Sequence, residues 1–296
     1  MRAIDLRDLV LLAALWGAYF LFMRVAAPAF GPIAMIELRV LFATLFLLPF
    51  VLKKKQLTTV RKYSKEMLVV GLLNSALPFC LFAYALLVLP AGFTAIINAT
   101  APMFGAAIAA IFLGQTLSAN RTLGLAIGFG GVVSLISSKG QLNIDGSLLT
   151  TFAAISAAAC YGIAANYSSR RLQGVPALAQ AFGSQAAAAA LLIIPALLTW
   201  PPQQPALTDW LNMLVLGIAC TGIAYLLYFR LISNVGATGA VSVTYLIPAF
   251  AMIWGWLFID ETVSPMMLIS CIVILLGTAL ATGFLSLKRL KPQITS

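Results

Sequence analysis

The sequence predicts an all-α polytopic membrane protein whose ten transmembrane helices form two inverted repeats of five. Two observations carry this prediction. Hydrophobic residues make up 62% of the chain and charged residues only 9%, with a mean hydropathy of +1.02, so apolar surface exceeds what a water-soluble core can hide. In addition, Pro102 and Pro248 stand at matching positions of two similar segments about 146 residues apart. An odd number of spans in each half forces the halves into opposite orientations.

Each expected span is a run of about 20 apolar residues, the length that crosses roughly 30 Å of hydrocarbon at 1.5 Å per residue. Short connections rich in Gly, Pro or Asn separate most runs, which predicts antiparallel neighbours. The expected spans cover residues 8–29, 32–52, 66–89, 91–113, 119–138, 146–168, 176–199, 208–233, 236–258 and 264–286. The two repeats are then residues 1–139 and 140–290, followed by a cytoplasmic tail at 291–296.

The eighteen Lys and Arg residues predict the orientation. With the N-terminus in the cytoplasm, all of them fall on the cytoplasmic side except Arg24, Arg39 and Lys139. The positive-inside rule therefore predicts cytoplasmic N- and C-termini in a bacterial inner membrane. Because the bases lie between apolar runs without interleaved aromatics, they predict no nucleic-acid binding, and the lipid bilayer is the expected partner. The basic loop at 53–65 also suits contact with anionic lipids.

Reactive side chains are scarce. The four cysteines lie inside apolar runs without CxxC spacing, and the chain has no histidine, so the sequence predicts no disulfide, no metal site and no cofactor. Intramembrane catalysis needs a nucleophile with a base, paired carboxylates or metal ligands. The sequence therefore predicts that the protein is not an enzyme.

Three charged residues lie inside the first two expected spans. Glu37 and Arg24 are each about five residues from the outer ends of neighbouring spans, and Arg39 is nearby. The sequence predicts a structural ion pair that ties these helix ends together, and a substrate or proton role remains the alternative. Glu37 is the one acid clearly inside an expected span, so the chain offers few groups for a proton relay, which favours transport without proton coupling.

Prolines indicate where a ligand would bind. Pro102 and Pro248 match each other, and Pro78 interrupts the third span; such breaks free backbone carbonyls and often line the central site of a transporter. Polar and aromatic side chains cluster near them, and this combination suits an amphipathic ligand. The predicted substrate-binding residues are Trp16, Tyr19, Asn74, Pro78, Phe79, Asn98, Pro102, Tyr161, Thr221, Tyr225, Thr244, Tyr245 and Pro248. Small residues in the fifth and tenth spans predict a scaffold or dimer face.

In each half, an apolar helix with a proline and small residues ends in a polar turn, LGQTLS at 113–118 and IDETVS at 259–264. This pattern resembles the EamA-type half-repeat of the drug/metabolite transporter superfamily over essentially the whole chain. That turn usually carries Gly-Glu, whereas the first copy here has Gly114 and Gln115. The aromatic interior is similar to the YddG-type aromatic amino-acid exporters.

The resemblance implies a transporter that exports amino acids, above all aromatic ones and related metabolites, by alternating access through a central cavity between the repeats. Phosphorylated substrates are disfavoured, because Arg24 and Arg39 are expected near the outer end rather than in the cavity. A zwitterion with an apolar side chain fits an uncharged cavity of amides and hydroxyls. A multidrug exporter of hydrophobic cations is the alternative, since aromatic faces attract cations. The sequence leaves monomer and homodimer open.

Overall fold

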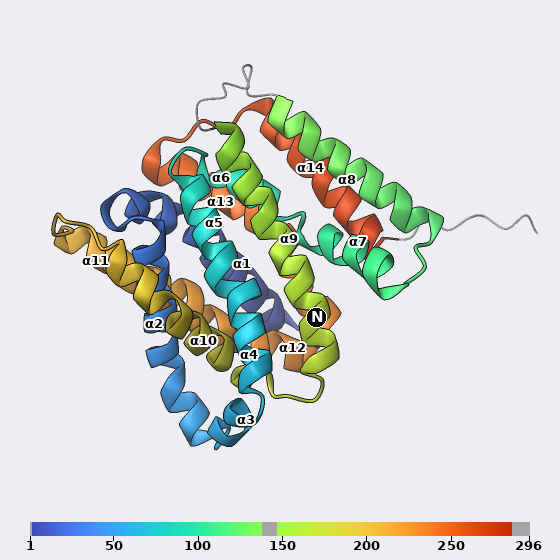
Figure 1. The fold of residues 1–296 in the computed structure, drawn as a ribbon. Coiled ribbons are helices and arrows are strands. Elements are labelled where there is room, and N and C mark those ends of the chain that lie inside the picture. The colour runs from blue at the N-terminus through green and yellow to red at the C-terminus, as the bar shows by residue number, and fades with distance from the viewer. Residues whose placement is uncertain (1, 138–146, 286–296) are drawn as a thin grey trace, which may run out of the picture.

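The computed structural model describes residues 2–137 and 147–285, and every regular element in these ranges is a helix. The expected boundary between the repeats and the tail at 291–296 lie outside the described residues. Figure 1 shows the arrangement. The first half contains α1 (Ala3–Phe30), α2 (Pro32–Lys53), α3 (Leu57–Lys62), α4 (Ser64–Gly71), η1 (Leu72–Ala76), α5 (Leu77–Leu86), α6 (Ala91–Asn98), α7 (Ala101–Leu113) and α8 (Ala119–Ser137). The second contains α9 (Ser147–Arg171), α10 (Ala177–Leu198), α11 (Leu207–Leu214), η2 (Val215–Ile223), α12 (Ala224–Val241), η3 (Ser242–Tyr245), α13 (Ile247–Ile259) and α14 (Pro265–Thr282).

Ten helical stretches in the described ranges are long and apolar enough to cross a membrane, which confirms the prediction. They are Ala3–Phe30, Pro32–Lys53, Ser64–Leu86, Ala91–Leu113, Ala119–Ser137, Ser147–Arg171, Ala177–Leu198, Leu207–Gly236, Gly239–Ile259 and Pro265–Thr282. With five in each half, the chain is a multi-pass membrane protein of two inverted repeats.

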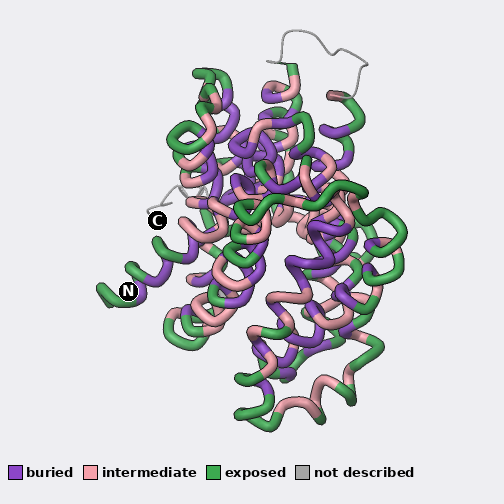
Figure 2. The backbone as a smooth tube through the Cα atoms, turned by 90° about the vertical axis from the view of Figure 1, so that its left-hand side faces the viewer, coloured by how far each residue is buried: buried purple, intermediate pink, exposed green. Residues whose placement is uncertain are grey.

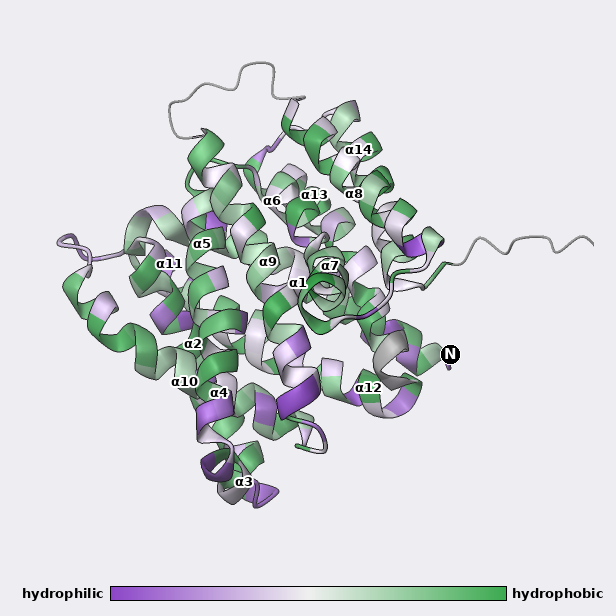
Figure 3. Ribbon diagram, turned by 45° about the vertical axis from the view of Figure 1, so that its right-hand side comes forward, coloured by the Kyte–Doolittle hydropathy of each residue, from purple (hydrophilic) through white to green (hydrophobic). Residues whose placement is uncertain are grey.

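The outer surface of the bundle is apolar. Phe112 is 76% exposed and Leu198 is 81% exposed, which a water-soluble protein would not tolerate over so many positions but which lipid favours. Buried residues concentrate along the centre of the bundle (Figure 2), while hydrophilic residues gather at α3 and near the N-terminus (Figure 3). The burial pattern therefore places the polar ends of the bundle in water and its flanks in lipid.

Four spans are interrupted at matching places in the two repeats. A π-helical segment, η1, joins α4 to α5 in the third span, and another, η2, joins α11 to α12 in the eighth. The fourth and ninth spans break before α7 and α13, where Pro102 and Pro248 occupy the first turn of the second half-helix. Pro102 and Pro248 thus begin helices rather than kink their middles, whereas Pro78 lies inside the continuous helical stretch Ser64–Leu86, just after the π-helical segment η1. The missing N–H of proline costs little at a helix start.

The turns after α7 and α13 show the repeat at atomic detail. Gly114 and Asp260 are both left-handed, with φ of 65° and 52°. The next residue in each turn donates its backbone N–H to the carbonyl six positions earlier, Gln115 to Ala109 at 3.2 Å and Glu261 to Gly255 at 3.0 Å. The matching residues are 146 positions apart, as the sequence comparison predicts.

Glycines bring the repeats into close contact in matching ways. A Cβ on Gly17 of α1 would lie 2.5 Å from Cβ of Phe250 on α13, and a Cβ on Gly162 of α9 would lie 2.9 Å from Cβ of Phe104 on α7. The fifth and tenth spans contact each other: α8 and α14 lie side by side (Figure 1), with Gly277 against the backbone of α8. Small residues here allow backbones to approach, as is typical of membrane helices.

Candidate functional site

A cavity of about 460 Å³ lies between the two repeats, in the size range of small-molecule sites. Its wall combines aromatic rings with amides and hydroxyls, and it receives side chains from the interrupted helices of both halves. Most of the residues that the sequence predicts as substrate-binding line it: Trp16, Tyr19, Asn74, Phe79, Asn98, Pro102, Tyr161, Thr221, Tyr225 and Thr244.

Three predicted binding residues do not line the cavity, and for them the expectation is corrected. The Tyr245 hydroxyl lies 3.4 Å from Oγ1 of Thr282, and its ring packs on Phe284 with centroids 5.5 Å apart. Pro78 and Pro248 sit in the first turns of α5 and α13. Each proline is next in the chain to a residue of the cavity wall, Pro78 to Phe79 and Pro248 to Ile247.

Several lining residues escape the sequence prediction. Tyr228 packs on Trp16 with ring centroids 5.2 Å apart. Cys220 lies at the position that matches Asn74 after a shift of 146 residues, so applying the repeat to Asn74 finds it. Small and aliphatic residues complete the wall: Ala101, Gly105, Ala165, Val241 and Ile247. Nothing in their local sequence marks them as ligand contacts.

Arg39 of α2 is the charged member of the cavity wall. Its side chain is buried, with the residue 3% exposed. Its Nε donates to Oγ1 of Thr221 at 3.0 Å, and one Nη lies 3.2 Å from the sulfur of Met23. The guanidinium carbon stands 3.8 Å from the ring centroid of Phe79 and 4.8 Å from that of Tyr19. Aromatic faces thus stabilise the cation where water cannot.

The expected ion pair of Arg24, Glu37 and Arg39 is wrong. In the described part of the chain, Arg24 pairs with Glu261 at 3.7 Å, and neither Glu37 nor Arg39 belongs to any ion pair within 4 Å. Glu37 is buried, and its Oε2 has no hydrogen-bond partner among the described residues. Arg24 is paired with Glu261 instead, and residues two apart on an α-helix are rotated by about 200° about its axis, so Arg39 faces the cavity while Glu37 does not line it.

Gln185 of α10 is the counterpart of Arg39 in the second repeat. Arg39 donates to Thr221 on η2, and Gln185 donates through Nε2 to Oγ of Ser75 on η1 at 2.9 Å. Both the donors and the acceptors are 146 positions apart. Gln185 also reaches the hydroxyl of Tyr225 at 3.3 Å. Each repeat therefore donates one hydrogen bond to a hydroxyl on the π-helical segment of the other repeat.

The turn after α13 connects the repeats at one end of the molecule. Both carboxylate oxygens of Glu261 accept from the backbone N–H of Ala91, at 2.9 and 2.8 Å, at the start of α6. Arg24 of α1 pairs with Glu261 and also donates to the carbonyl of Leu86. Negative charge at a helix N-terminus is favourable because the helix dipole and the free N–H groups point at it. Glu261 thus ties three helices together.

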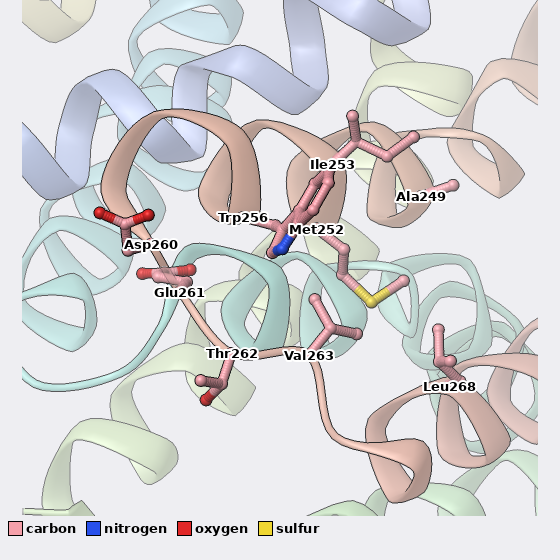
Figure 4. Close-up of a pocket in the computed structure, with 9 residues that line it drawn as sticks. All are labelled: Ala249, Met252, Ile253, Trp256, Asp260, Glu261, Thr262, Val263 and Leu268. Carbon is pink, nitrogen blue, oxygen red and sulfur yellow. The ribbon is translucent and has the colours of Figure 1, made fainter.

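Glycine makes this contact possible, because a Cβ on residue 255 would lie 2.6 Å from Oε2 of Glu261. Beside the turn, an apolar groove of about 710 Å³ runs between α13 and the extended segment leading to α14 (Figure 4). In the matching turn of the first repeat, Gln115 is exposed and Ala109 stands in place of Gly255. The two matching turns therefore differ in their side chains: Glu261 contacts other helices, and Gln115 is exposed.

A central aromatic cavity walled by broken helices of two inverted repeats is typical of membrane transporters. The described residues contain no cluster of His, Cys, Asp or Glu able to hold a metal ion. The EamA-like transporter family matches the chain twice, at residues 9–137 and 148–283. The protein belongs to this family of membrane transporters.

Relatives share the architecture along nearly their full length. The chain is 24% identical over 277 residues to "Uncharacterized transporter YoaV" of Bacillus subtilis (strain 168), covering 90% of this chain and 93% of that protein. It is 27% identical over 273 residues to "Uncharacterized inner membrane transporter YedA" of Escherichia coli (strain K12), covering 90% and 87%. A crystal structure at 20% identity superposes with a TM-score of 0.66, covering 96% of this chain and 98% of that one. The last likeness concerns the fold alone.

Proposed function

We propose that the protein exports amino acids, above all aromatic amino acids and related small metabolites, across a bacterial inner membrane. The observation that carries the proposal is the cavity, in which aromatic faces such as Trp16, Tyr161 and Tyr228 stand beside amides and a buried arginine. An aromatic side chain packs on such faces, while its polar backbone groups need the amides, hydroxyls and charge.

The proposed mechanism is alternating access between the two repeats. The end at Glu261 is held closed by the contacts to Ala91 and Arg24, and a Cβ on Gly92 of α6 would lie 2.6 Å from Met252 of α13. With both termini in the cytoplasm, this closed end faces outward. We propose that rocking of the repeats breaks these contacts and forms the matching ones at the Gln115 end.

Transport is proposed to run without proton coupling at the cavity. Its described lining contains no carboxylate and no histidine, and Glu37, a buried acid of α2, does not line it. An imposed pH gradient should therefore drive no accumulation of labelled phenylalanine in proteoliposomes beyond equilibration. Accumulation that collapses with a protonophore would overturn this part of the proposal.

The alternative, export of hydrophobic cations, rests on the same aromatic faces. The unpaired charge of Arg39 argues against it, because a like charge in a low-dielectric cavity repels the ligand. Uptake of phenylalanine and of methyl viologen in one proteoliposome preparation separates the two functions. Methyl viologen uptake without phenylalanine uptake would favour the alternative.

Two aromatic substitutions test the site. Trp16→Ala removes a ring from the cavity wall and should lower phenylalanine flux at least about 10-fold, since aromatic truncations cost several kcal/mol where the ring is a contact. Tyr245→Ala is the matched control, because Tyr245 packs on Phe284 outside the cavity, and it should keep near wild-type flux. Absence of amino-acid flux in the wild type would refute the proposed function.

A further inference from the structure

Arg39 is a buried cation without a counter-ion among the residues that the structure describes. None of the four ion pairs between described residues includes it, and the described cavity wall contains no Asp or Glu. An uncompensated charge inside a membrane protein is costly. Its aromatic neighbours reduce this cost without neutralising the charge. The cavity wall therefore carries a positive charge at Arg39.

The guanidinium also has hydrogen-bonding capacity to spare. It carries five N–H donors, and its two hydrogen bonds to described residues use Nε toward Thr221 and Nη1 toward the weak acceptor sulfur of Met23. Nη2 has no acceptor among the described residues. A planar fork with free donors, fixed in place by Thr221 and Phe79, is suited to a carboxylate, which it can bind through two parallel hydrogen bonds.

The wall offers no equivalent group for an ammonium. In its described part, a substrate cation would meet only neutral oxygens, such as those of Asn74, Asn98 and Thr244, and aromatic faces. Neutral acceptors can hydrogen-bond to an ammonium, but they stay satisfactory without one. The carboxylate of a ligand therefore meets an opposite charge in the cavity, whereas its ammonium does not.

We propose that the site recognises its substrate by a carboxylate held on Arg39 and an apolar or aromatic body held on the surrounding rings, and that the amino group is dispensable. Aromatic monocarboxylates without an amino group then bind alongside the aromatic amino acids. This inference rests on the proposed function for the location of the site, and it adds which part of the substrate is recognised.

Three ligands of one carbon skeleton test the inference on purified wild-type protein by calorimetry. Phenylalanine carries both charges, 3-phenylpropionate only the carboxylate and phenethylamine only the ammonium. Binding is measured directly because the neutral acid crosses lipid unaided. We expect phenylpropionate to bind within about threefold of phenylalanine, and phenethylamine roughly 10- to 100-fold more weakly, the range for one charge-assisted contact.

The second part of the experiment repeats the three binding measurements on variants of Arg39. Arg39→Gln should weaken both carboxylates roughly 10- to 100-fold and leave phenethylamine unchanged or tighter, whereas Arg39→Lys, which keeps the charge but loses the fork, should fall between. Arg61→Gln, at an exposed position of α3, is the matched control. Since phenethylamine binding reports a folded cavity, loss of all three ligands in Arg39→Gln counts as misfolding, and the wild-type ligand series then decides alone.

The outcomes separate the inference from the function. If phenethylamine binds the wild type as tightly as phenylpropionate, or if Arg39→Gln keeps the preference for carboxylates, the inference is wrong even where phenylalanine is transported. If phenylpropionate binds through Arg39 but no amino acid is transported, the inference stands and the proposed function fails.

Discussion

Arg39 and Gln185 occupy matching positions of the two repeats, and the comparison between them is instructive. Each donates to a hydroxyl on the π-helical segment of the opposite half, Thr221 at 3.0 Å and Ser75 at 2.9 Å. The geometry is shared, yet Arg39 is charged and lines the cavity while Gln185 is neutral and stands behind Tyr225. The repeated backbone sets where polar groups lie, and the side chain at one copy sets the polarity of the cavity.

The two polar turns show the same division. Their backbones match through Gly114 and Asp260, but Glu261 caps α6 and pairs with Arg24, whereas the described contacts of Gln115 include no such bond. An acid that binds a helix start and a cation holds its end closed more firmly than an amide does. Packing is therefore symmetric between the repeats, and charge is not.

The largest expected effect is on phenylalanine binding, when the side chain of Arg39 is replaced and the result is compared with replacement of Gln185. Arg39→Gln, which makes the two positions alike, should weaken phenylalanine binding roughly 10- to 100-fold. Gln185→Ala removes a neutral bond outside the cavity wall and should change it by less than about 5-fold. Calorimetry on both variants measures how far each substitution weakens phenylalanine binding. Equal losses of affinity would mean that the charge of Arg39 contributes nothing to binding.

Symmetric packing predicts equal costs for matched glycines. Gly17→Ala and Gly162→Ala each force a Cβ against the facing helix, which should destabilise the protein by about 1–3 kcal/mol in both cases. Thermal unfolding in detergent measures the change. Gly130→Ala is the control, because a Cβ at that position meets nothing within 4 Å. A loss at only one of the two glycines would contradict symmetric packing.

Glu261→Gln tests the charged turn. The amide offers one acceptor oxygen and no charge to Arg24. The free energy of opening at the Glu261 end should therefore fall by about 1–2 kcal/mol, so that this end is open roughly 5- to 30-fold more often. The readout is maleimide labelling of Asn98→Cys, in a background without the native cysteines, from the side of that turn. Gln115→Ala should leave this labelling unchanged. Unaltered labelling in Glu261→Gln would show that the carboxylate does not hold the end closed.

The smallest effect is expected from building the missing contact at the other end. Ala109→Gly with Gln115→Glu gives the first turn the pair that Gly255 and Glu261 form in the second. It should slow phenylalanine exchange about 2- to 3-fold, because an exposed charge at a helix start contributes only a few tenths of a kcal/mol. Gln115→Glu alone, with the Ala109 Cβ still in the way, should slow it less. Faster exchange in the double variant would contradict the comparison.

Much of the site follows from sequence because the repeat and the prolines mark it. The matched positions of Pro102 and Pro248 locate the helix breaks, and aromatic or polar residues near a break, such as Trp16, Asn98 and Thr244, line the cavity. Tyr245 does not line the cavity, although Thr244 does, because successive residues of a 3₁₀-helix such as Ser242–Tyr245 point about 120° apart. Spacing along the chain gives depth in the membrane but not the rotation of a helix about its axis.

The charged residues show the same limit. Similar depth in the membrane predicts that Arg24 pairs with Glu37. In the structure Arg24 pairs with Glu261, which is far away in the sequence, and Arg39 faces the cavity. Only the packing of α1 against α13 and of α2 against η2 brings these groups together. A sequence contains no local signal for a contact between residues in different repeats.

By itself the sequence determines the lipid environment, the number of spans, the breaks and the twofold repeat, because these depend on apolar length, proline chemistry and periodicity. The tertiary structure alone decides which side of each helix faces the cavity and which charges meet. Those choices depend on close packing between helices far apart in the chain, set by contacts such as Gly17 on Phe250. In this protein they bring Arg39 to the cavity wall without an acidic partner among the described residues, and they bring Glu261 to Ala91 and Arg24 at one end of the molecule.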